Sequence, residues 1–530
     1  MDRRTLLTSA AALAATAATA ATAACEGDRR PTAPRTRALA TTGTPTATRT
    51  AAAGATPTPT GWTALARGLA GTLVRPGDAD YPTARQLYNT RFDALRPAAV
   101  AYVANEADIK ECLSFARRHP GTRLAIRNGG HSYGGWSSGN DRLVIDISKL
   151  DKVGTDGTIG AGAKLIDVYR ALARKNRTIP AGSCPTVGIS GLTLGGGHGV
   201  VSRAYGLTCD SLTSARLVTA DGRTLTASAS QNPDLFWALR GAGNGNFGVV
   251  TELRFRTHDA PACVTAYLKW PWSKARAVIS AWQEWGPAQP DEIWSSAHLA
   301  AGAGVGEPTV TVSAFSLGTY GELQNAVDRL ADKVGASASY VTLRRRGYEQ
   351  AMLLYAGCAD FSDAQCHLPG TTPGRTPQGR LRRETYAARS DFFDRSLPSA
   401  ATSALLGRME RFGVTAAEGG GNGSVVLTAL GGAVNRVDPA ATAFVHRRSR
   451  MLAQYIASWR PGTTGAAQQT WLKDTHGALR RYASGAAYQN YPDPTLTDWR
   501  RAYYGDAAPR LAALKQRYDP TRLFDFPQAL

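Results

Sequence analysis

The sequence predicts an α+β protein made of two regions with different construction, and three patterns support this fold class. From residue 97 onward, short apolar runs of strand length alternate with stretches of helical period. From about residue 261, apolar and polar residues alternate instead, which indicates half-buried antiparallel strands. Two glycine-rich segments follow strands of the first region, and turns at strand ends are suited to binding a cofactor. A chain of 530 residues leaves room for two or three cores.

The N-terminus contains signals for export rather than for folding. Within residues 1–25, the twin arginines Arg3 and Arg4 precede an alanine-rich run that is too short to span a membrane. This arrangement is typical of a twin-arginine signal peptide and predicts a secreted or cell-surface protein without a transmembrane segment. Cys25 follows two alanines as a lipoprotein acceptor would, so a lipid anchor at this residue is an alternative. Residues 26–75, which begin with a stretch rich in Thr, Ala and Pro, are expected to form a disordered linker.

The charge and the cysteine pattern exclude two classes of function. A net charge of +20 is compatible with binding to nucleic acid or to an anionic surface. However, the longest basic run is residues 344–346 and no nucleic-acid motif accompanies it, so we predict a solvated basic surface and no nucleic-acid partner. The seven cysteines form neither a CxxC pair nor a Cys/His zinc spacing, so no metal site is expected.

The periodicity predicts individual elements in both regions. A dinucleotide fingerprint with its ribose-binding acid is absent, so the first region is not expected to be a Rossmann nicotinamide domain. Strands of the first region are predicted at residues 100–103, 124–127, 143–147 and 249–253, with helices at 106–119 and 165–175. In the second region, strands are predicted at residues 265–270 and 309–315, with helices at 321–334 and 449–459.

The two glycine-rich segments contain the candidate chemistry. Residues 127–135 have the sequence R-N-G-G-H-S-Y-G-G, and residues 184–199 have the sequence C-P-T-V-G-I-S-G-L-T-L-G-G-G-H-G. Because glycines lack side chains and tolerate positive φ, their N–H groups can converge on an anion such as a pyrophosphate. Each segment also presents one residue that can form a covalent bond, namely His131 through an imidazole nitrogen and Cys184 through a thiolate. A loop histidine or a buried cysteine is ordinary when taken singly, whereas the two in this order and spacing are specific.

Together these segments resemble the FAD-binding domain of the berberine-bridge-enzyme-like oxidases, a family of FAD-linked oxidases related to vanillyl-alcohol oxidase that includes oligosaccharide oxidases. Residues 232–251 and a Y-Q-N-Y-P-D-P segment near the C-terminus follow in the same order. The resemblance implies a PCMH-type FAD-binding domain with two subdomains over residues 93–260. It also implies a substrate-binding domain over residues 261–480, which would be an antiparallel sheet with helices on one face and a strand at 430–437. A C-terminal segment, residues 485–528, would return to the FAD domain.

The resemblance also implies how the cofactor is held. FAD would be bicovalent, joined to His131 through the flavin 8α-methyl carbon and to Cys184 through the flavin C6. Val187 lies where the family tends to have Val in oxygen-reactive members, which favours an oxidase. Similar chains have a cysteine pair at the position of Cys358 and Cys366, which are therefore the disulfide candidate. Further contacts with FAD are implied for Arg127, Asn128, Gly129, Gly130, Ser132, Gly188, Gly191, Gly195, Gly196, His198, Gly248 and Val250.

For catalysis, the resemblance assigns the base to a tyrosine of a Y-x-N-Y motif. Tyr488 is the favoured candidate here and Tyr491 is the second. Since an unperturbed tyrosine has a pKa of about 10, this role requires nearby positive charge or hydrogen bonds that favour the phenolate. Close relatives often have an acidic or aromatic partner just before a Gly-Gly pair, and Thr428 and its neighbours occupy that stretch here. Tyr133 and Trp136 are candidate substrate-facing aromatic residues.

These features predict an exported oxidase that acts on an alcohol carbon of an oligosaccharide or of a secondary metabolite. Hydride would pass to flavin N5, and O2 would reoxidise the flavin with release of H2O2. A dehydrogenase or a bond-forming flavoenzyme on the same scaffold is the first alternative. A surface lipoprotein that binds a ligand without turnover is the second. No oligomeric state is predicted.

Overall fold

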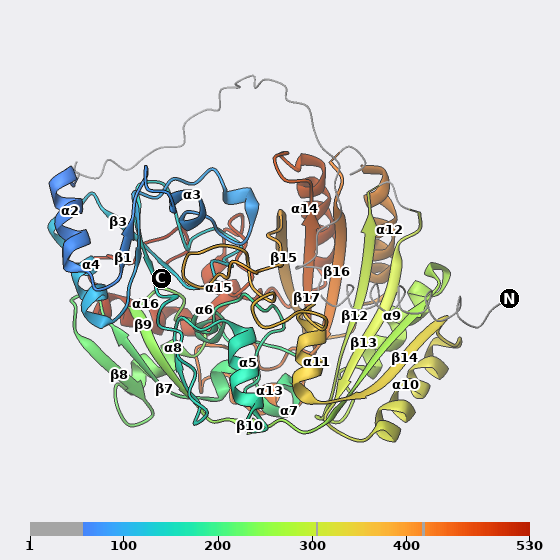
Figure 1. The fold of residues 1–530 in the computed structure, drawn as a ribbon. Coiled ribbons are helices and arrows are strands. Elements are labelled where there is room, and N and C mark those ends of the chain that lie inside the picture. The colour runs from blue at the N-terminus through green and yellow to red at the C-terminus, as the bar shows by residue number, and fades with distance from the viewer. Residues whose placement is uncertain (1–56, 304–305, 416–418) are drawn as a thin grey trace.

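The predicted α+β fold class is confirmed. The structure, a computed structural model, describes residues 57–303, 306–415 and 419–530. Figure 1 shows two domains side by side, with the sheets of the first domain on one side and one large sheet on the other.

The first domain contains two four-stranded sheets. One consists, in spatial order, of β1 (Thr72–Val74), β2 (Ala99–Tyr102), β4 (Arg142–Asp146) and β3 (Arg123–Arg127). In this sheet β2, β4 and β3 are parallel, and only the edge strand β1 is antiparallel. The other sheet is antiparallel throughout and consists of β5 (Thr158–Gly160), β9 (Val249–Phe255), β7 (Leu212–Val218) and β8 (Thr224–Ser228).

Helices cover these sheets as the sequence predicts. α4 (Glu106–Arg118) begins after Asn105, whose side chain accepts a hydrogen bond from the backbone N–H of Asp108 at 3.0 Å. Arg117 and Arg118 occupy its last turn, where positive charge complements the helix dipole. The predicted helix at 106–119 and the four predicted strands of this region are confirmed within one or two residues at each end. The other helices of this domain are α3 (Tyr81–Ala84), α5 (Leu165–Ala173), α6 (Ile189–Leu194), α7 (Ser202–Tyr205) and α8 (Pro233–Leu239).

Part of the stretch expected to be a disordered linker is folded. Within residues 26–75, α2 (Pro59–Gly68) packs against α4, and the ring centroids of Trp62 and Phe115 are 4.8 Å apart. The reason is local, because Thr58 caps the helix by accepting from the N–H of Gly61, and a proline follows at the first helical position. Residues 1–56, which include the expected signal and Cys25, lie outside the described residues.

The second domain is a seven-stranded antiparallel sheet with four helices on one face. In spatial order its strands are β14 (Tyr340–Arg346), β11 (Cys263–Trp270), β13 (Thr309–Ser316), β12 (Ile293–Gly302), β16 (Asn422–Ala429), β17 (Met451–Ser458) and β15 (Tyr386–Phe393). The helices are α9 (Ala275–Trp285), α10 (Tyr320–Val334), α12 (Ser399–Thr415) and α14 (Ala466–Arg480), seen at the outer side of the sheet in Figure 1. The opposite face is directed at the first domain, and its Trp294 and Phe315 belong to the core of that domain.

Two predictions for the second domain are wrong. Residues 449–459 were predicted to be a helix, but residues 451–458 form β17. This strand has a neighbour on each side and is buried on both faces, so its apolar residues do not alternate. Residues 430–437, expected to be a strand, follow the end of β16. Gly431 and Gly432 adopt φ of +106° and +56°, which ends the strand, and the short helix α13 (Ala433–Arg436) comes next.

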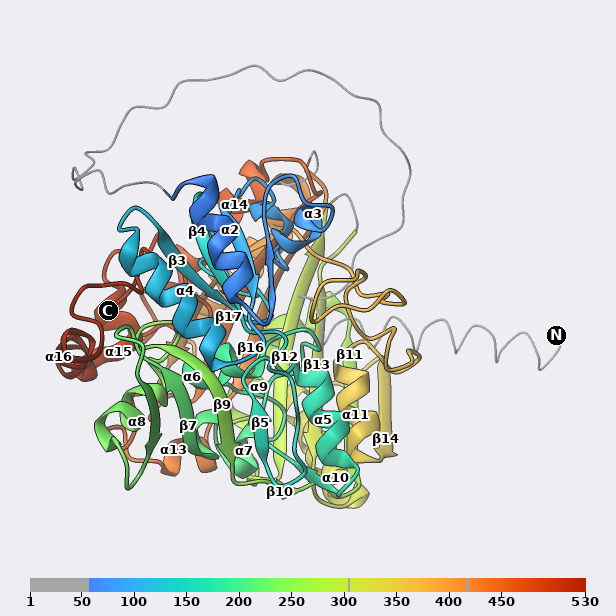
Figure 2. The same cartoon turned by 60° about the vertical axis from the view of Figure 1, so that its left-hand side comes forward.

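Connecting segments join the two domains. α11 (Tyr348–Tyr355) lies beside α5, as Figure 2 shows, and the short strands β6 (Arg177–Thr178) and β10 (His258–Asp259) pair beneath them. After α11, Cys358 and Cys366 form a disulfide with Cα atoms 5.7 Å apart.

The C-terminal segment packs on the first domain through α15 (Trp499–Tyr504) and α16 (Ala508–Tyr518). The buried Lys515 donates to the backbone oxygen of Asn246 at 2.8 Å and pairs with Asp519 at 2.7 Å. The chain end is held as well, since the N–H of Leu530 donates to the Asn246 side chain.

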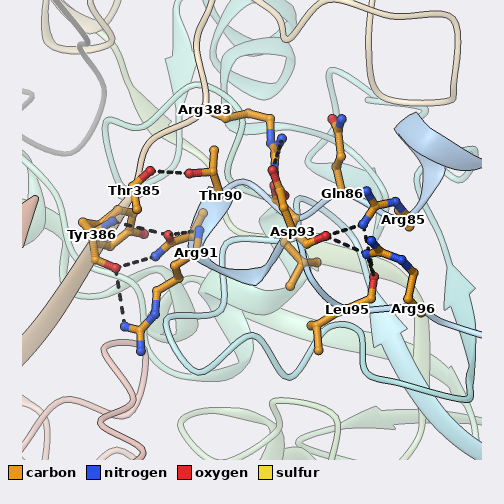
Figure 3. A network of polar contacts seen from close by, with 12 residues as sticks. Arg85, Gln86, Thr90, Arg91, Asp93, Leu95, Arg96, Arg383, Thr385 and Tyr386 are labelled. Atoms are coloured by element: carbon orange, nitrogen blue, oxygen red, sulfur yellow. Dashed lines mark hydrogen bonds and ion pairs between the residues drawn. The ribbon is translucent and has the colours of Figure 1, made fainter. Parts of the chain in front are cut away.

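A second connection joins the first domain to the start of β15 (Figure 3). The N–H of Thr90 donates to the backbone oxygen of Glu384 at 2.7 Å. Arg383 donates to the backbone oxygen of Leu87 at 2.7 Å and pairs with the carboxylate of Asp93. These contacts fix the edge strand of the large sheet against the first domain.

Candidate active site

A cavity of about 400 Å³ lies between the first domain and the inward face of the large sheet. Its wall on the first domain is formed by the glycine turn after β3 and by the segment that leads into α6. The C-terminal segment around residues 488–492 closes one side. The residues from the sheet are Trp294, Ser296 and His298 of β12, Val426 and Thr428 of β16, Gln454 and Ile456 of β17, and Tyr386 of β15.

The first glycine turn directs His131 into this cavity. Gly129 is required there, because a Cβ atom would lie 2.5 Å from the backbone oxygen of Thr186. The Nε2 atom of His131 lies 2.8 Å from the Thr186 hydroxyl, and the imidazole stacks on Tyr88 with 4.0 Å between ring centroids. Burial, with a contribution from Lys164, lowers the pKa of His131 to about 3, so the imidazole is neutral and retains a nucleophilic nitrogen.

The second glycine-rich segment brings the thiol of Cys184 to the same cavity. Cys184 and Val187 are half-buried, and both line the space together with Gly188 and Gly191. Gly188 precedes α6, and a Cβ there would lie 2.2 Å from the side chain of Asn128, so the two glycine-rich segments pack directly on each other. The structure therefore brings His131 and Cys184, which are far apart in the chain, to one cavity.

Four buried polar atoms of the cavity wall have no hydrogen-bond partner among the described residues. Buried polar groups are nearly always bonded, so such atoms indicate a polar ligand. They lie beside the bare backbone of the glycine turns, and this combination fits a large polar cofactor such as FAD. The four atoms are His198 Nδ1, Asn244 Oδ1, Gln489 Oε1 and Gln528 Oε1.

The two tyrosines of the Y-x-N-Y motif differ in their surroundings. The hydroxyl of Tyr488 accepts from the N–H of Gly197 at 2.8 Å and from the amide of Asn490 at 2.9 Å, and the ring packs on Phe392 and Phe444. In contrast, Tyr491 is half-buried at the cavity. Burial is the main cause that raises the pKa of both phenols above the ordinary value.

Tyr491 is held by two cavity residues. Its hydroxyl lies 2.9 Å from the Nε2 atom of His198. Its ring is stacked parallel on Tyr133, with 5.1 Å between centroids and an interplanar angle of 2°. Tyr133 in turn accepts a hydrogen bond from the Gln454 side chain at 2.7 Å. Burial lowers the pKa of His198 to about 4, so its imidazole is neutral at physiological pH.

Most of the residues expected to contact FAD line the cavity, but three do not. Arg127 is 4% exposed and pairs with Asp146 on the far side of the glycine turn. Gly195 makes room for Asn490, since a Cβ would lie 2.1 Å from its Oδ1 atom, and Gly196 packs against Phe444. These glycines position the Y-x-N-Y segment instead. The expected residues that do line the cavity are Asn128, Gly129, Gly130, His131, Ser132, Tyr133, Trp136, Cys184, Val187, Gly188, Gly191, His198, Gly248, Val250, Tyr488 and Tyr491.

Sequence reasoning missed the polar face that the sheet presents to the cavity. Ser296 and His298 of β12 are two residues apart, so their side chains share this face, and Nε2 of His298 lies 2.8 Å from the Ser296 hydroxyl. Thr428 pairs with Ser296 across the strands. Ser296 and His298, two residues apart in a mainly apolar strand, were the available signal. Among the described lining residues the one carboxylate is Asp525, which comes from the C-terminal segment and not from the sheet.

Comparisons with known proteins show which family the chain resembles. Residues 97–228 match the family described as FAD binding domain, and residues 487–530 match the family described as berberine and berberine like. The chain is 31% identical over 479 residues to the uncharacterized FAD-linked oxidoreductase YgaK of Bacillus subtilis, covering 87% of this chain and 97% of that protein. It is 31% identical over 470 residues to the xylooligosaccharide oxidase of Thermothelomyces thermophilus, covering 82% and 87%. The solved structure of Physcomitrella patens BBE-like 1 has a TM-score of 0.78 at 31% identity, covering 88% of this chain and 98% of that one.

The fold and the cavity thus define an FAD-linked oxidoreductase. Within that class, the chain belongs to the berberine-bridge-enzyme-like family. In the described ranges, no group of three or more His, Cys, Asp or Glu residues is arranged to hold a metal ion. Nor does any helix in those ranges have the length and apolar character needed to cross a membrane.

Proposed function

We propose that this enzyme is an oxidase with a bicovalent FAD, which oxidises an alcohol carbon of an oligosaccharide and releases H2O2. The observation that carries the proposal is the presence of His131, Cys184 and Tyr491 at one cavity whose opposite wall is neutral and polar. Relatives named chitooligosaccharide oxidase and xylooligosaccharide oxidase support the substrate class. Hydroxyl, amide and imidazole groups on the sheet, together with aromatic rings, suit an uncharged, hydroxyl-rich substrate.

When bound, FAD supplies the two-electron acceptor and the reactivity with O2. The chain's own contribution begins with attachment, for which His131 offers a neutral imidazole and Cys184 a half-buried thiol. The backbone of residues 128–132 and of residues 188–191 would hold the cofactor's polar groups. The moderate size of Val187 at the cavity supports access of O2.

Tyr491, rather than Tyr488, is our candidate for the base. Tyr488 lines the cavity, but its hydroxyl oxygen already accepts two hydrogen bonds from the protein. No lysine or arginine is among the described lining residues, so a phenolate stabilised by a cation is not supported. Instead, a neutral His198 can accept the Tyr491 proton at Nε2 while the Tyr491 oxygen takes the proton of the substrate hydroxyl. His198 thereby substitutes for the acidic partner that is missing near Thr428, and Ser296 and His298 would orient the substrate.

The attachment is tested on denatured protein. The purified enzyme and its His131→Ala, Cys184→Ala and doubly substituted variants are precipitated with acid, and flavin is measured in pellet and supernatant. We expect flavin in the pellet for the wild type and both single variants, and flavin only in the supernatant for the double variant. If one single variant already releases all its flavin, the residue that remains in it is not a covalent tether, and the bicovalent attachment is wrong.

The activity is tested by screening oligosaccharides while H2O2 formation and O2 consumption are both recorded. Equal rates of the two identify an oxidase. Substrate-dependent flavin bleaching without O2 consumption would identify the dehydrogenase alternative.

Export through the twin-arginine route is the remaining part of the proposal, and it rests on residues 1–25. Replacing Arg3 and Arg4 with lysine is expected to retain the folded flavoprotein inside the cell. The Cys25→Ser variant tests the lipid anchor. A lipid-anchored wild type would partition with membranes and the variant would be released, whereas an unanchored protein would be released in both cases.

A further inference from the structure

A second, smaller cavity of about 40 Å³ lies on the far side of the first glycine turn from the active site. Tyr88, Asn128 and Gly129 line both cavities, so only the turn itself separates them. The walls include the ends of β3 and β4, the residue that precedes α5, the segment over residues 83–88 and a loop over residues 368–375.

The wall of this cavity has three cationic side chains and one carboxylate. Arg127 and Lys164 are 4% and 5% exposed, and Arg375 of the loop is half-buried. The carboxylate, Asp146, already accepts from the Nε of Arg127 and from the N–H of Ser148. The surplus is therefore positive in a place where an uncompensated charge is costly.

Neutral groups are the hydrogen-bond partners of the two other cations. Lys164 donates to the side chains of Asn128 and Ser148 and to the backbone oxygen of Gly162. Arg375 donates to the backbone oxygen of Pro369 and to the Gln86 side chain. Burial lowers the pKa of Lys164 to about 8 and that of Arg375 to about 10, and the charge of Asp146 offsets only part of this effect. Asp151 and Asp167 also act on Lys164, but neither lines the cavity. Arg127 lowers the pKa of both cations, and Arg383 lowers that of Arg375 further, so the neighbouring charges add to the positive surplus.

One donor at this cavity has no partner. The Nη1 atom of Arg127 is buried and bonds to no described residue. Hydroxyl groups of Tyr102, Thr186 and Thr372 also line the space, and each can turn its O–H toward an anion. This combination of surplus positive charge and a buried guanidinium nitrogen without a described partner selects for an anion.

We propose that this cavity binds one small monovalent anion of the chloride class, held by Arg127, Lys164 and Arg375. A cavity of about 40 Å³ has room for a single small ion, which favours a halide over a bulkier phosphate ester.

Three residues connect the proposed anion site to His131 of the active site. Tyr88 stacks on His131, Thr186 bonds to its Nε2, and Gly129 belongs to the turn that positions it, and all three line the anion cavity. The loop over residues 368–375 comes close to Lys164 at Gly374. This position requires glycine, because its φ is +80° and a Cβ there would lie 2.9 Å from Cε of Lys164. The anion would thus hold the loop, the turn and His131 together.

The direct test is diffraction from crystals of the holoenzyme grown with bromide as the only halide. We expect one anomalous bromide peak enclosed by the three cations. A water molecule refined at that position in the bromide crystal overturns the proposal.

A second test measures the thermal unfolding temperature of the holoenzyme in chloride, bromide, gluconate and inorganic phosphate at one ionic strength. Chloride and bromide are expected to raise Tm above its gluconate value, and phosphate is not. Arg375→Gln, which lies on the loop and leaves the Arg127–Asp146 pair intact, should abolish the halide-specific increment. Arg345→Gln on the exposed side of β14 changes the charge equally and should retain it. Equal Tm in all four salts, or a full increment in Arg375→Gln, overturns the proposal.

Discussion

At the scale of single residues, the contrast between Tyr491 and Tyr488 decides how the cavity can act. Both belong to one motif, yet one hydroxyl is saturated by donors from the protein and the other faces a neutral imidazole. A proton acceptor must have a free lone pair. The hydrogen bonds of the two hydroxyl groups therefore distinguish Tyr491 from Tyr488 more clearly than the burial of their side chains does.

The matched substitutions Tyr491→Phe and Tyr488→Phe test this assignment. Tyr491→Phe should lower kcat on the order of 10²- to 10⁴-fold, as loss of a general base does, with flavin content and Tm preserved. Tyr488→Phe removes the acceptor for the buried N–H of Gly197 and should lower stability by about 1–3 kcal/mol. Steady-state kinetics and thermal unfolding of both variants provide the readout. A larger loss of kcat in Tyr488→Phe would reverse the roles.

The role of His198 predicts a pH profile. Since its pKa is lowered from the ordinary 6.5 to about 4, the imidazole remains neutral, and able to accept a proton, down to about pH 4. We expect kcat/KM to be flat from pH 7 to about 5 and to fall below that as His198 becomes protonated. In His198→Asn the rate should be low throughout and the acidic limb absent. An inflection near pH 6.5 in the wild type would contradict a buried, neutral His198.

At the scale of elements, the glycine turns work through backbone contacts. Gly129→Ala should push the first turn away from Thr186, because the added Cβ would lie 2.5 Å from a backbone oxygen that has little freedom to move. We expect a loss of stability of roughly 1–3 kcal/mol and a lower fraction of covalently attached flavin. Gly477→Ala in α14 is the control, since its Cβ would meet nothing within 4 Å and it should stabilise by about 0.5–1 kcal/mol. Normal flavin attachment in Gly129→Ala would show that the turn tolerates displacement.

The elements also show how far the sequence determines the fold. Strands such as β2 and helices such as α4 were predictable because their apolar pattern and caps agree. β17 was not, since burial on both faces removes the alternation that distinguishes a strand from a helix. The glycine-rich segments and the Y-x-N-Y motif predicted residues that do line one cavity. The contacts of Tyr491, the polar face with His298 and the position of Arg127 were not predictable, because each depends on segments distant in the sequence.

At the scale of the whole molecule, the proposed catalysis requires two domains held in a fixed relation, since the cavity has one wall in each. The contacts in Figure 3 join them at the edge strand β15, where Arg383 reaches both the Leu87 backbone and Asp93. The Arg383 side chain is 14% exposed, so this is a partly buried connection rather than a surface ion pair. Exposed pairs contribute little to stability, whereas a buried donor and its acceptors are costly to separate.

Arg383→Met therefore should loosen the domains without touching the cavity. The backbone oxygen of Leu87 would lose its donor, which costs about 1–3 kcal/mol when it remains buried. We expect KM to rise more than kcat falls, because the substrate contacts both walls while the tethers and Tyr491 stay with the first domain. Hydrogen exchange should increase at residues 383–393 and not in β2. Arg395→Met, an exposed arginine just beyond β15, is the control and should leave kinetics and exchange unchanged. Unaltered exchange in Arg383→Met would mean that the large shared core alone holds the domains together.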